Sequence, residues 1–294
     1  MLQDSVEMSE YFLFEGLRMP PILTNVETLC FAREEFLVRD DDVIILSYPR
    51  SGTHWIIEII GLIYFNGDPT WIQTVPIFLR SPWIEDAHLQ KDLVNQNGPR
   101  LMVSHLPVQL FPRSYFSCNA KVVYILRNPK DILTSLYHIS RGFLCKKQPE
   151  TFDEFLNRFM EGDMHYGSWF DHTLGWIKKR DMGSFLLIFY EELQRDPRAS
   201  VEKICQFLGK KLKPEEIDLV IQNSSFSAMK ENTMSDHFAI HSNLQKAIIS
   251  PTLRKGKTWN QPKCPSMTDR TKKMWHTDRL LTFVYSTRRG NRGV

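Results

Sequence analysis

The stretch 42–65, DVIILSYPRSGTHWIIEIIGLIYF, constrains the fold of this chain more than any other. Residues 43–46 form an uninterrupted aliphatic run, which is typical of a strand covered on both faces of a parallel sheet. Residues 48–55 form a turn, and from Ile56 onward apolar residues recur at helical spacing. A strand, a small-residue turn and a helix N-terminus predict an anion-binding cradle, because backbone N–H groups and the helix dipole both favour negative charge there.

The residues of the turn support this interpretation. Gly52 allows the backbone to approach an oxyanion closely, Ser51 and Thr53 offer hydroxyl donors, and Arg50 supplies a fixed positive charge. The pattern is not a Walker A motif, because it has a single glycine and its basic residue precedes that glycine. Taken alone, the motif is more often an ordinary strand-to-helix turn with a serine cap. The basic turns that follow later in the chain favour a phosphate site instead.

Three further strand-like segments alternate with helical patterns. Residues 100–108 end their strand at His105, residues 120–126 are followed by Arg127, and residues 185–189 are followed by Tyr190. This alternation predicts a single α/β domain with a central, mainly parallel sheet flanked by helices. Because ligands bind at the carboxyl ends of parallel strands, Arg50 and these three residues are expected to gather at one edge of the sheet.

The segments before and between these strands are less regular. Residues 1–20 are interpreted as an irregular lead-in with aromatic anchors, and residues 69–83, rich in Trp, Phe, Ile and Pro, as a loop that lines an apolar pocket. For the aromatic side chains of this second segment, plain core packing is an equally good explanation. Helices are expected at 26–38, 132–139, 152–162, 169–179, 197–208 and 214–222.

Charge and cysteine content narrow the range of functions. The chain has 37 basic and 34 acidic residues, which is too balanced for general nucleic-acid binding. Its five cysteines are scattered and never form a C-x-x-C pair, which argues against a disulfide framework or a zinc site and favours a reducing compartment. No secretory signal is visible, and no apolar run reaches the ~20 residues of a membrane-spanning helix. We therefore expect a soluble cytoplasmic protein without a membrane partner.

The same residues indicate phosphate chemistry without a metal ion. A nucleotide-triphosphate enzyme usually has an acidic residue at a strand end to hold magnesium, whereas two strands here are followed by Arg127 and Tyr190. A further basic cluster at 253–257 suggests a ligand with more than one phosphate group. His105 is the candidate general base, because it lies at a strand end beside a predicted apolar pocket. Judged alone, it would more often be a structural histidine.

Six short motifs occur in one collinear order and together resemble the signatures of the cytosolic sulfotransferases. They are YPRSGTHW at 48–55, SHLP at 104–107, RNPKD at 127–131, YEEL at 190–193, NSSFSAMKEN at 223–232 and RKG at 254–256. PIFLRSPWIE at 76–85 and YGSWFDH at 166–172 resemble the hydroxysteroid (alcohol, bile salt) branch. The resemblance covers about residues 10–258. It implies metal-independent transfer of a sulfuryl group from 3′-phosphoadenosine 5′-phosphosulfate (PAPS) to an acceptor hydroxyl, which is EC 2.8.2 chemistry.

The resemblance also implies roles for individual residues. It makes His105 the general base and places Arg50 with the catalytic groups and the 5′-phosphosulfate cradle. The cofactor-binding set that it implies is Arg50, Ser51, Gly52, Thr53, His54, Trp55, Arg127, Ser135, Tyr190, Ser224, Met229, Arg254, Lys255 and Gly256. An apolar pocket for a small hydrophobic hydroxylated acceptor is predicted to include Phe78, Trp83, Tyr137 and Phe143.

The chain departs from the family pattern at three places. Arg50 stands where the family has lysine, and His54 where this branch usually has asparagine; His54 is a bystander, an added donor or an auxiliary base. In the tail, 259–294, only Trp259 and Asn260 match, so the dimer signature expected for a homodimer is not recognisable. Two alternatives stay open: a PAPS-binding isoform with reduced or no turnover, and a P-loop-like small-molecule kinase.

Overall fold

The computed structural model describes residues 11–141, 151–181 and 184–235. The chain divides into two compact units, Met1–Gly256 and Lys257–Val294, and all described residues belong to the first. Four predicted site residues lie outside the described residues: Phe143, Arg254, Lys255 and Gly256. The divergent tail lies outside them as well, so a single domain spanning 1–294 stays a prediction.

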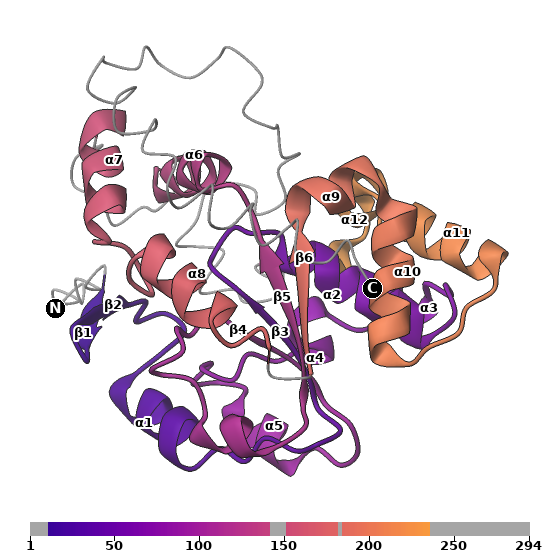
Figure 1. The fold of residues 1–294 in the computed structure, drawn as a ribbon, viewed down its shortest axis with the longest axis horizontal. Helices are drawn as coiled ribbons and strands as arrows, with labels where there is room; N and C mark the ends of the chain where they lie inside the picture. Colours follow the sequence, from indigo (N-terminus) through magenta and orange to yellow (C-terminus); the bar gives the residue numbers. More distant parts are fainter. Residues whose placement is uncertain (1–10, 142–150, 182–183, 236–294) are drawn as a thin grey trace, which may run out of the picture. The chain divides into compact units, whose positions relative to one another are not determined.

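A four-stranded parallel sheet forms the centre of the fold (Figure 1). Its strands follow the spatial order β4 (Leu101–Ser104), β3 (Val43–Ser47), β5 (Lys121–Leu126) and β6 (Phe185–Phe189). Leu46 pairs with Ser104 on one side and with Tyr124 on the other, so the carboxyl ends of the strands are level. The predicted α/β fold with a central parallel sheet is confirmed, and the strand ends meet at one edge.

Helices cover both faces of this sheet, with α2 (Thr53–Tyr64), α10 (Pro197–Leu208) and α11 (Pro214–Asn223) on one side and α8 (Trp169–Ile177) on the other (Figure 1). Alternate strand residues pack with the first three helices: Val43, Ile45, Leu101, Val103, Val123, Ile125, Leu186 and Ile188. On the opposite face, the hydroxyl of Tyr124 lies 3.2 Å from His172 Nδ1 of α8. Burial on both faces explains why these strands are apolar without alternation.

Local capping chemistry marks the start of several of the remaining helices. Asn25 caps α1 through its side chain, Thr151 and Glu154 form a capping box at α7, and Pro129 opens α6 behind the cap of Asn128. The bounds of the helices and 3₁₀ turns not given so far, apart from α3 and α4, are α1 (Val26–Glu34), α5 (Gln90–Asn95), the 3₁₀ turn Arg113–Ser117, α6 (Pro129–Ser140), α7 (Phe152–Glu161), α9 (Tyr190–Arg195), α12 (Phe226–Glu231) and the 3₁₀ turn Thr233–Ser235.

Two expectations about irregular segments were wrong. The lead-in contains a hairpin, β1 (Phe12–Phe14) paired with β2 (Leu17–Met19), whose two-residue turn places Glu15 and Gly16 at φ 50° and 77°. Such a turn matches the twist of paired strands.

The segment 69–83 is also not a loop. It contains α3 (Thr70–Thr74) and α4 (Ile77–Arg80), which are too short to be stable alone. Tertiary contacts hold α4, because the guanidinium of Arg80 makes two hydrogen bonds of 2.8 and 2.7 Å to the carboxylate of Glu58 on α2. Both side chains are fully buried.

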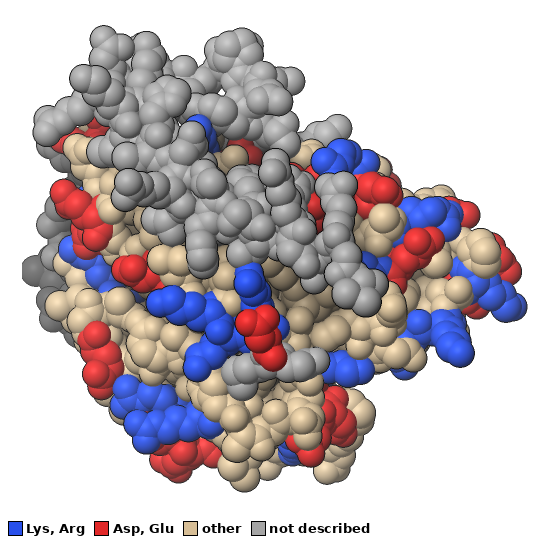
Figure 2. Space-filling view, in the orientation of Figure 1, with Lys and Arg blue, Asp and Glu red and all other residues tan. Residues whose placement is uncertain are grey.

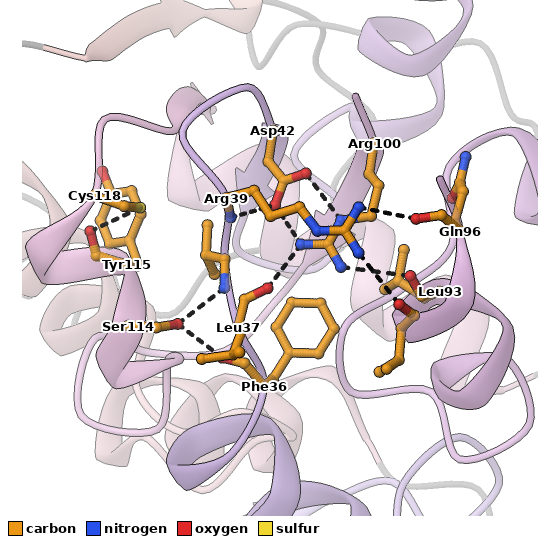
Figure 3. A network of polar contacts seen from close by, with 12 residues as sticks. Phe36, Leu37, Arg39, Asp42, Leu93, Gln96, Arg100, Ser114, Tyr115 and Cys118 are labelled. Atoms are coloured by element: carbon orange, nitrogen blue, oxygen red, sulfur yellow. Dashed lines mark hydrogen bonds and ion pairs between the residues drawn. The ribbon is translucent and has the colours of Figure 1, made fainter. Parts of the chain in front are cut away.

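The edge of the sheet at which the strands begin is closed by a polar network (Figure 3). Arg100, just before β4, donates from Nε to Asp42 Oδ1 at 2.9 Å and from Nη2 to the carbonyl of Leu37 at 2.8 Å. The other carboxylate oxygen of Asp42 accepts the amide of Arg39 at 2.8 Å. Asp42 and Arg100 are both buried, and every charged oxygen of this pair has a partner.

Charged side chains of both signs are mixed on the face of the described part of the chain that Figure 2 shows. On the face shown in Figure 2, lysine and arginine side chains alternate with aspartate and glutamate around the described part of the chain. Among the described helices, none combines the length and the apolar character needed to cross a bilayer.

Candidate functional site

The turn between β3 and α2 forms a cradle with unusual backbone geometry. Gly52 lies at φ 107°, and a Cβ added there would stand 2.7 Å from Cδ2 of Tyr190. Arg50, which is not glycine, lies at φ 70°. The N-terminal amides of α2 lack intrahelical acceptors, as at the start of any helix, and face this turn. Glycine is therefore required at 52, and the strained turn is of the kind found at functional sites.

Two arginines and two aromatic rings join this cradle to the neighbouring strands. Arg127, which follows β5, donates from Nη1 to the carbonyl of Arg50 at 2.9 Å, and its guanidinium lies 4.2 Å from the ring centroid of Tyr190. Trp55 meets Tyr190 edge to face at 5.6 Å, and Arg50 Nε donates to Ser135 Oγ on α6 at 3.0 Å. Four elements thus bring cations and hydroxyls to one edge of the sheet.

Arg127 also carries an unsatisfied donor. The residue is 8% exposed, and its Nε, which is buried, has no hydrogen-bond partner among the described residues. A buried guanidinium N–H without an acceptor is costly, and an anion in the cradle would remove that cost. The residues present therefore fit a phosphate group.

His105 lies immediately after β4, next to the same cradle. Its Nδ1 is 2.7 Å from the carbonyl oxygen of Ser47, the last residue of β3, and the hydroxyl of Ser47 is 2.8 Å from Oγ1 of Thr53 in α2. Because a carbonyl can only accept, Nδ1 carries the proton and Nε2 carries the lone pair. The imidazole is thus held in the tautomer that a general base at Nε2 requires.

Aromatic rings surround this imidazole. Trp83 meets it edge to face at 4.5 Å and Tyr166 at 5.5 Å, and His105 is 5% exposed. Burial raises the pKa of Tyr166 well above its ordinary value, so the phenol stays neutral. Trp83, one of the residues predicted to line the acceptor pocket, is therefore in contact with His105.

The other predicted lining residues lie farther along their elements. Phe78 is buried on α4, and Tyr137 of α6 packs against Phe152 and Phe155 of α7 at 5.2 and 5.6 Å.

Four further members of the predicted cofactor-binding set are partly assembled. Trp55 and Tyr190 are in contact, whereas Ser224 and Met229 are buried at the junction of α11 and α12. The hydroxyl of Ser224 donates to the carbonyl of Val220 at 2.7 Å. α11 packs against α2, which carries the cradle. His54 lies in the first turn of α2.

Sequence reasoning missed two buried residues that contact His105. The amide of His105 donates to Glu85 Oε1 at 2.7 Å, and Nε2 of His172 lies 3.1 Å from the carbonyl oxygen of His105. Burial raises the pKa of Glu85 to about 7 and lowers that of His172 to about 3. Glu85 is the last residue of the motif PIFLRSPWIE, and His172 is the last residue of YGSWFDH. The motifs thus contained both residues, but their position in the sequence does not show that they contact His105.

Within the described residues, no group of three or more His, Cys, Asp and Glu side chains is placed to hold a metal ion. The three cysteines there, Cys30, Cys118 and Cys205, are free thiols.

Comparison with known proteins identifies relatives of this chain. The model of the sulfotransferase domain matches residues 40–275. Sulfotransferase 2A1 of Macaca fascicularis is 53% identical over 230 residues, which are 78% of this chain and 81% of the relative. The 3-beta-hydroxysteroid sulfotransferase of Cavia porcellus is 49% identical over 243 residues, 83% of this chain and 84% of the relative.

Solved structures show the same fold. The crystal structure of mouse sulfotransferase SULT7A1 complexed with PAP has a TM-score of 0.74 and 30% sequence identity, and the match covers 94% of both chains. Retinol dehydratase in complex with androsterone and the inactive cofactor PAP has a TM-score of 0.72 at 21% identity, with coverage of 95% of this chain and 89% of that one.

Proposed function

Because this chain belongs to the sulfotransferase family, and to its hydroxysteroid branch, we propose that it transfers the sulfuryl group of PAPS to a hydroxyl of a hydrophobic, steroid-like acceptor. One observation carries the proposal: an unsatisfied buried donor of Arg127 beside the strained turn at Arg50 and Gly52, with His105 two strands away at the same edge. A likeness to a sulfotransferase structure that contains PAP supports the choice of nucleotide.

The cradle residues fit the phosphate groups of this donor. The amides at the start of α2, with Ser51 and Thr53, would hold the 5′-phosphosulfate, and Arg127 with Ser135 the 3′-phosphate. Trp55 and Tyr190 would stack against the adenine. When bound, PAPS supplies an activated sulfuryl group, whose transfer leaves negative charge on a phosphate oxygen. Arg50 and the helix amides lie where they can stabilise that charge.

His105 would act on the acceptor. Its Nε2 takes the proton of the acceptor hydroxyl as the hydroxyl oxygen forms its bond to sulfur and the bond from sulfur to the leaving phosphate breaks. The carbonyl of Ser47 accepts the Nδ1–H bond, which keeps the lone pair on Nε2 until Nε2 takes this proton. The ring of Trp83 against His105 supports an apolar surface for the acceptor. The name of the 3-beta-hydroxysteroid sulfotransferase of Cavia porcellus supports a hydroxyl of a steroid as the target.

We further propose a cytosolic location, which the free thiols at Cys30, Cys118 and Cys205 support. Homodimerisation stays a prediction, because the tail that would carry the dimer contact lies outside the described residues.

The test is transfer of labelled sulfate from PAPS, in the presence of a chelator, across a panel of steroids, bile acids and phenols. We expect transfer to hydroxysteroids and a fall in kcat of about 10²–10⁴-fold in His105→Ala, with binding of PAP retained. Retained transfer in His105→Ala would contradict the base assignment. Binding of PAP without transfer to any acceptor would select a nucleotide-binding isoform, and phosphoryl transfer from ATP and magnesium would select a kinase.

A further inference from the structure

Two buried side chains form hydrogen bonds with the backbone of His105, one with its amide N–H and one with its carbonyl oxygen. Glu85, from the segment after α4, accepts the amide N–H of His105 at Oε1, 2.7 Å away. His172, from α8, donates from Nε2 to the carbonyl of His105 at 3.1 Å. Glu85 is fully buried and His172 is 1% exposed. The residue that carries the predicted base is therefore fixed at both of its backbone polar groups as well as at Nδ1.

The neighbours of His172 fix the tautomer in which its Nε2 is the donor. The hydroxyl of Tyr124, on β5, lies 3.2 Å from Nδ1 of His172 and donates to it, because Nε2 already carries the proton. Burial lowers the pKa of His172 to about 3, so the ring stays neutral at ordinary pH. This contact to His105 is therefore constant across the working range of pH.

Glu85 differs from the other buried acids of the fold. The carboxylate oxygens of Glu58 are both paired with Arg80, and those of Asp42 both with Arg100. Glu85 has no ion pair among the described residues, and its Oε2, which is buried, has no hydrogen-bond partner there. A backbone N–H at a strand end can be satisfied by a neutral acceptor at lower cost. A buried acid retained in this position indicates a function for its charge.

The titratable groups near Glu85 are Asp86 beside it in the chain, Tyr166 from the turn before α8, and His105, whose backbone amide donates to Glu85. Tyr166 is neutral, and Asp86 adds negative charge to the same side. The hydroxyl of Ser104 and the amide of His105 are the donors that favour the ionised form of Glu85.

We propose that Glu85 and His172 are positioning residues for His105, which together hold its backbone so that Nε2 faces the acceptor hydroxyl, while the carboxylate of Glu85 favours the imidazolium that forms during transfer. The inference rests on the proposed role of His105 as base. Glu85 and His172 exchange no proton with the substrate: the acceptor proton passes to Nε2 of His105 and stays there until product leaves.

The test compares matched substitutions in the full chain. His172→Leu removes the donor to His105, whereas His172→Gln offers an amide N–H in place of Nε2. Glu85→Gln keeps an oxygen for the amide of His105 and removes the charge. Asp42→Asn makes the same acid-to-amide change at the opposite edge of the sheet, and so serves as the control for destabilisation. For each protein we would measure thermal stability, the Kd of PAP, and kcat and KM against pH.

We expect His172→Leu to lower kcat about 10–100-fold, with the Kd of PAP changed less than about threefold, and His172→Gln to recover most of the loss. In Glu85→Gln the difference from the wild type should lie above about pH 7, where Glu85 is ionised: kcat there should fall, because the imidazolium that forms during transfer loses the anion that favours it. Asp42→Asn should reduce stability and leave the pH–rate profile in place.

Three results would overturn the proposal: unchanged kcat and pH profile in folded His172→Leu and Glu85→Gln, an equal change in Asp42→Asn, or no rescue by His172→Gln. If His172→Leu does not fold, the Gln variants still decide, because Glu85→Gln retains the shape of the side chain it replaces and His172→Gln retains an N–H donor. The His105→Ala assay separates this failure from failure of the base role itself: full activity in His105→Ala contradicts the proposed base, whereas its inactivity beside fully active Glu85 and His172 variants contradicts positioning alone.

Discussion

The two edges of the parallel sheet differ in how their buried polar groups are paired. At the edge where the strands begin, Asp42 and Arg100 satisfy each other and the surrounding carbonyls (Figure 3). At the edge where the strands end, Arg127 and Glu85 each keep a buried polar atom without a partner among the described residues, and Arg50 adopts a left-handed backbone. The first edge is organised for stability, whereas the second holds polar groups ready for a ligand.

This difference indicates that the activity lies at the edge where the strands end. The same strands connect both edges, so their burial alone cannot explain why one edge is complete and the other is not. Asp42 is a buried acid that is paired with a guanidinium, whereas Glu85 is a buried acid without such a partner among the described residues. A buried charged group that is left unpaired indicates a role in chemistry. Variants at each edge should therefore separate stability from activity.

The largest effect on stability is expected at the edge where the strands begin. Arg100→Ala leaves the carboxylate of Asp42 buried without its cation, and should lower the free energy of unfolding by about 3–5 kcal/mol, with kcat per folded molecule unchanged. Urea denaturation measures the first quantity and active-site titration the second. Arg113→Ala is the control, because the exposed pair of Arg113 with Glu34 should contribute about 1 kcal/mol or less. Equal denaturation midpoints for the two variants would break the comparison.

The next effect is a pH-dependent stability at the opposite edge. The pKa of Glu85 rises from 4.5 to about 7 on folding, so between these values the folded state binds more protons than the unfolded state. The stability of the wild type should therefore fall as pH rises through this window, by about 3 kcal/mol in total.

Glu85→Gln lacks this titration. The difference in unfolding free energy between Glu85→Gln and the wild type should grow in favour of the variant from about pH 4 to pH 8. Denaturant melts at a series of pH values measure it, with Asp42→Asn as the matched amide substitution. A difference that does not vary with pH would mean that Glu85 is not buried as an acid.

A smaller effect is expected in the cradle turn. Gly52→Ala places a methyl group 2.7 Å from Tyr190 in a backbone conformation that alanine rarely adopts, and should cost about 1–3 kcal/mol of stability. It should also weaken PAP binding at least tenfold, because the ring of Tyr190 must move. Gly98→Ala shares the positive φ without any neighbour within 4 Å, so it should leave PAP binding intact. Calorimetric titration with PAP distinguishes the two, and equal affinities would remove Gly52 from the cradle.

The smallest effect concerns Arg50. Its Nε is engaged with Ser135, and its planar fork is less suited than a lysine ammonium to a point contact on a leaving oxygen. Arg50→Lys should retain the Kd of PAP and raise kcat by about 3–10-fold, a barrier change near 1 kcal/mol. Arg127→Lys, in contrast, should weaken PAP binding. Equal turnover in wild type and Arg50→Lys would show that the arginine does not limit the reaction.

The buried strands and their polar ends could be predicted from the sequence. Apolar runs such as 43–46 have few alternatives in an α/β chain, and each run is followed by a distinctive residue such as Arg127 or Tyr190. The hairpin at Phe12–Met19 and the helix Ile77–Arg80 could not be predicted in this way. Their stability comes from a turn of two residues with positive φ and from a buried pair with a residue 22 positions away.

The local pattern of the chain determined which residues end each strand, because side-chain period and turn chemistry act over a few neighbouring residues. Only the tertiary structure decided that Glu85 and His172 meet the backbone of His105 from two other elements, and that the donor of Arg127 is buried without an acceptor among the described residues. Burial and hydrogen-bond geometry depend on segments far apart in the chain, and spacing in sequence does not record them.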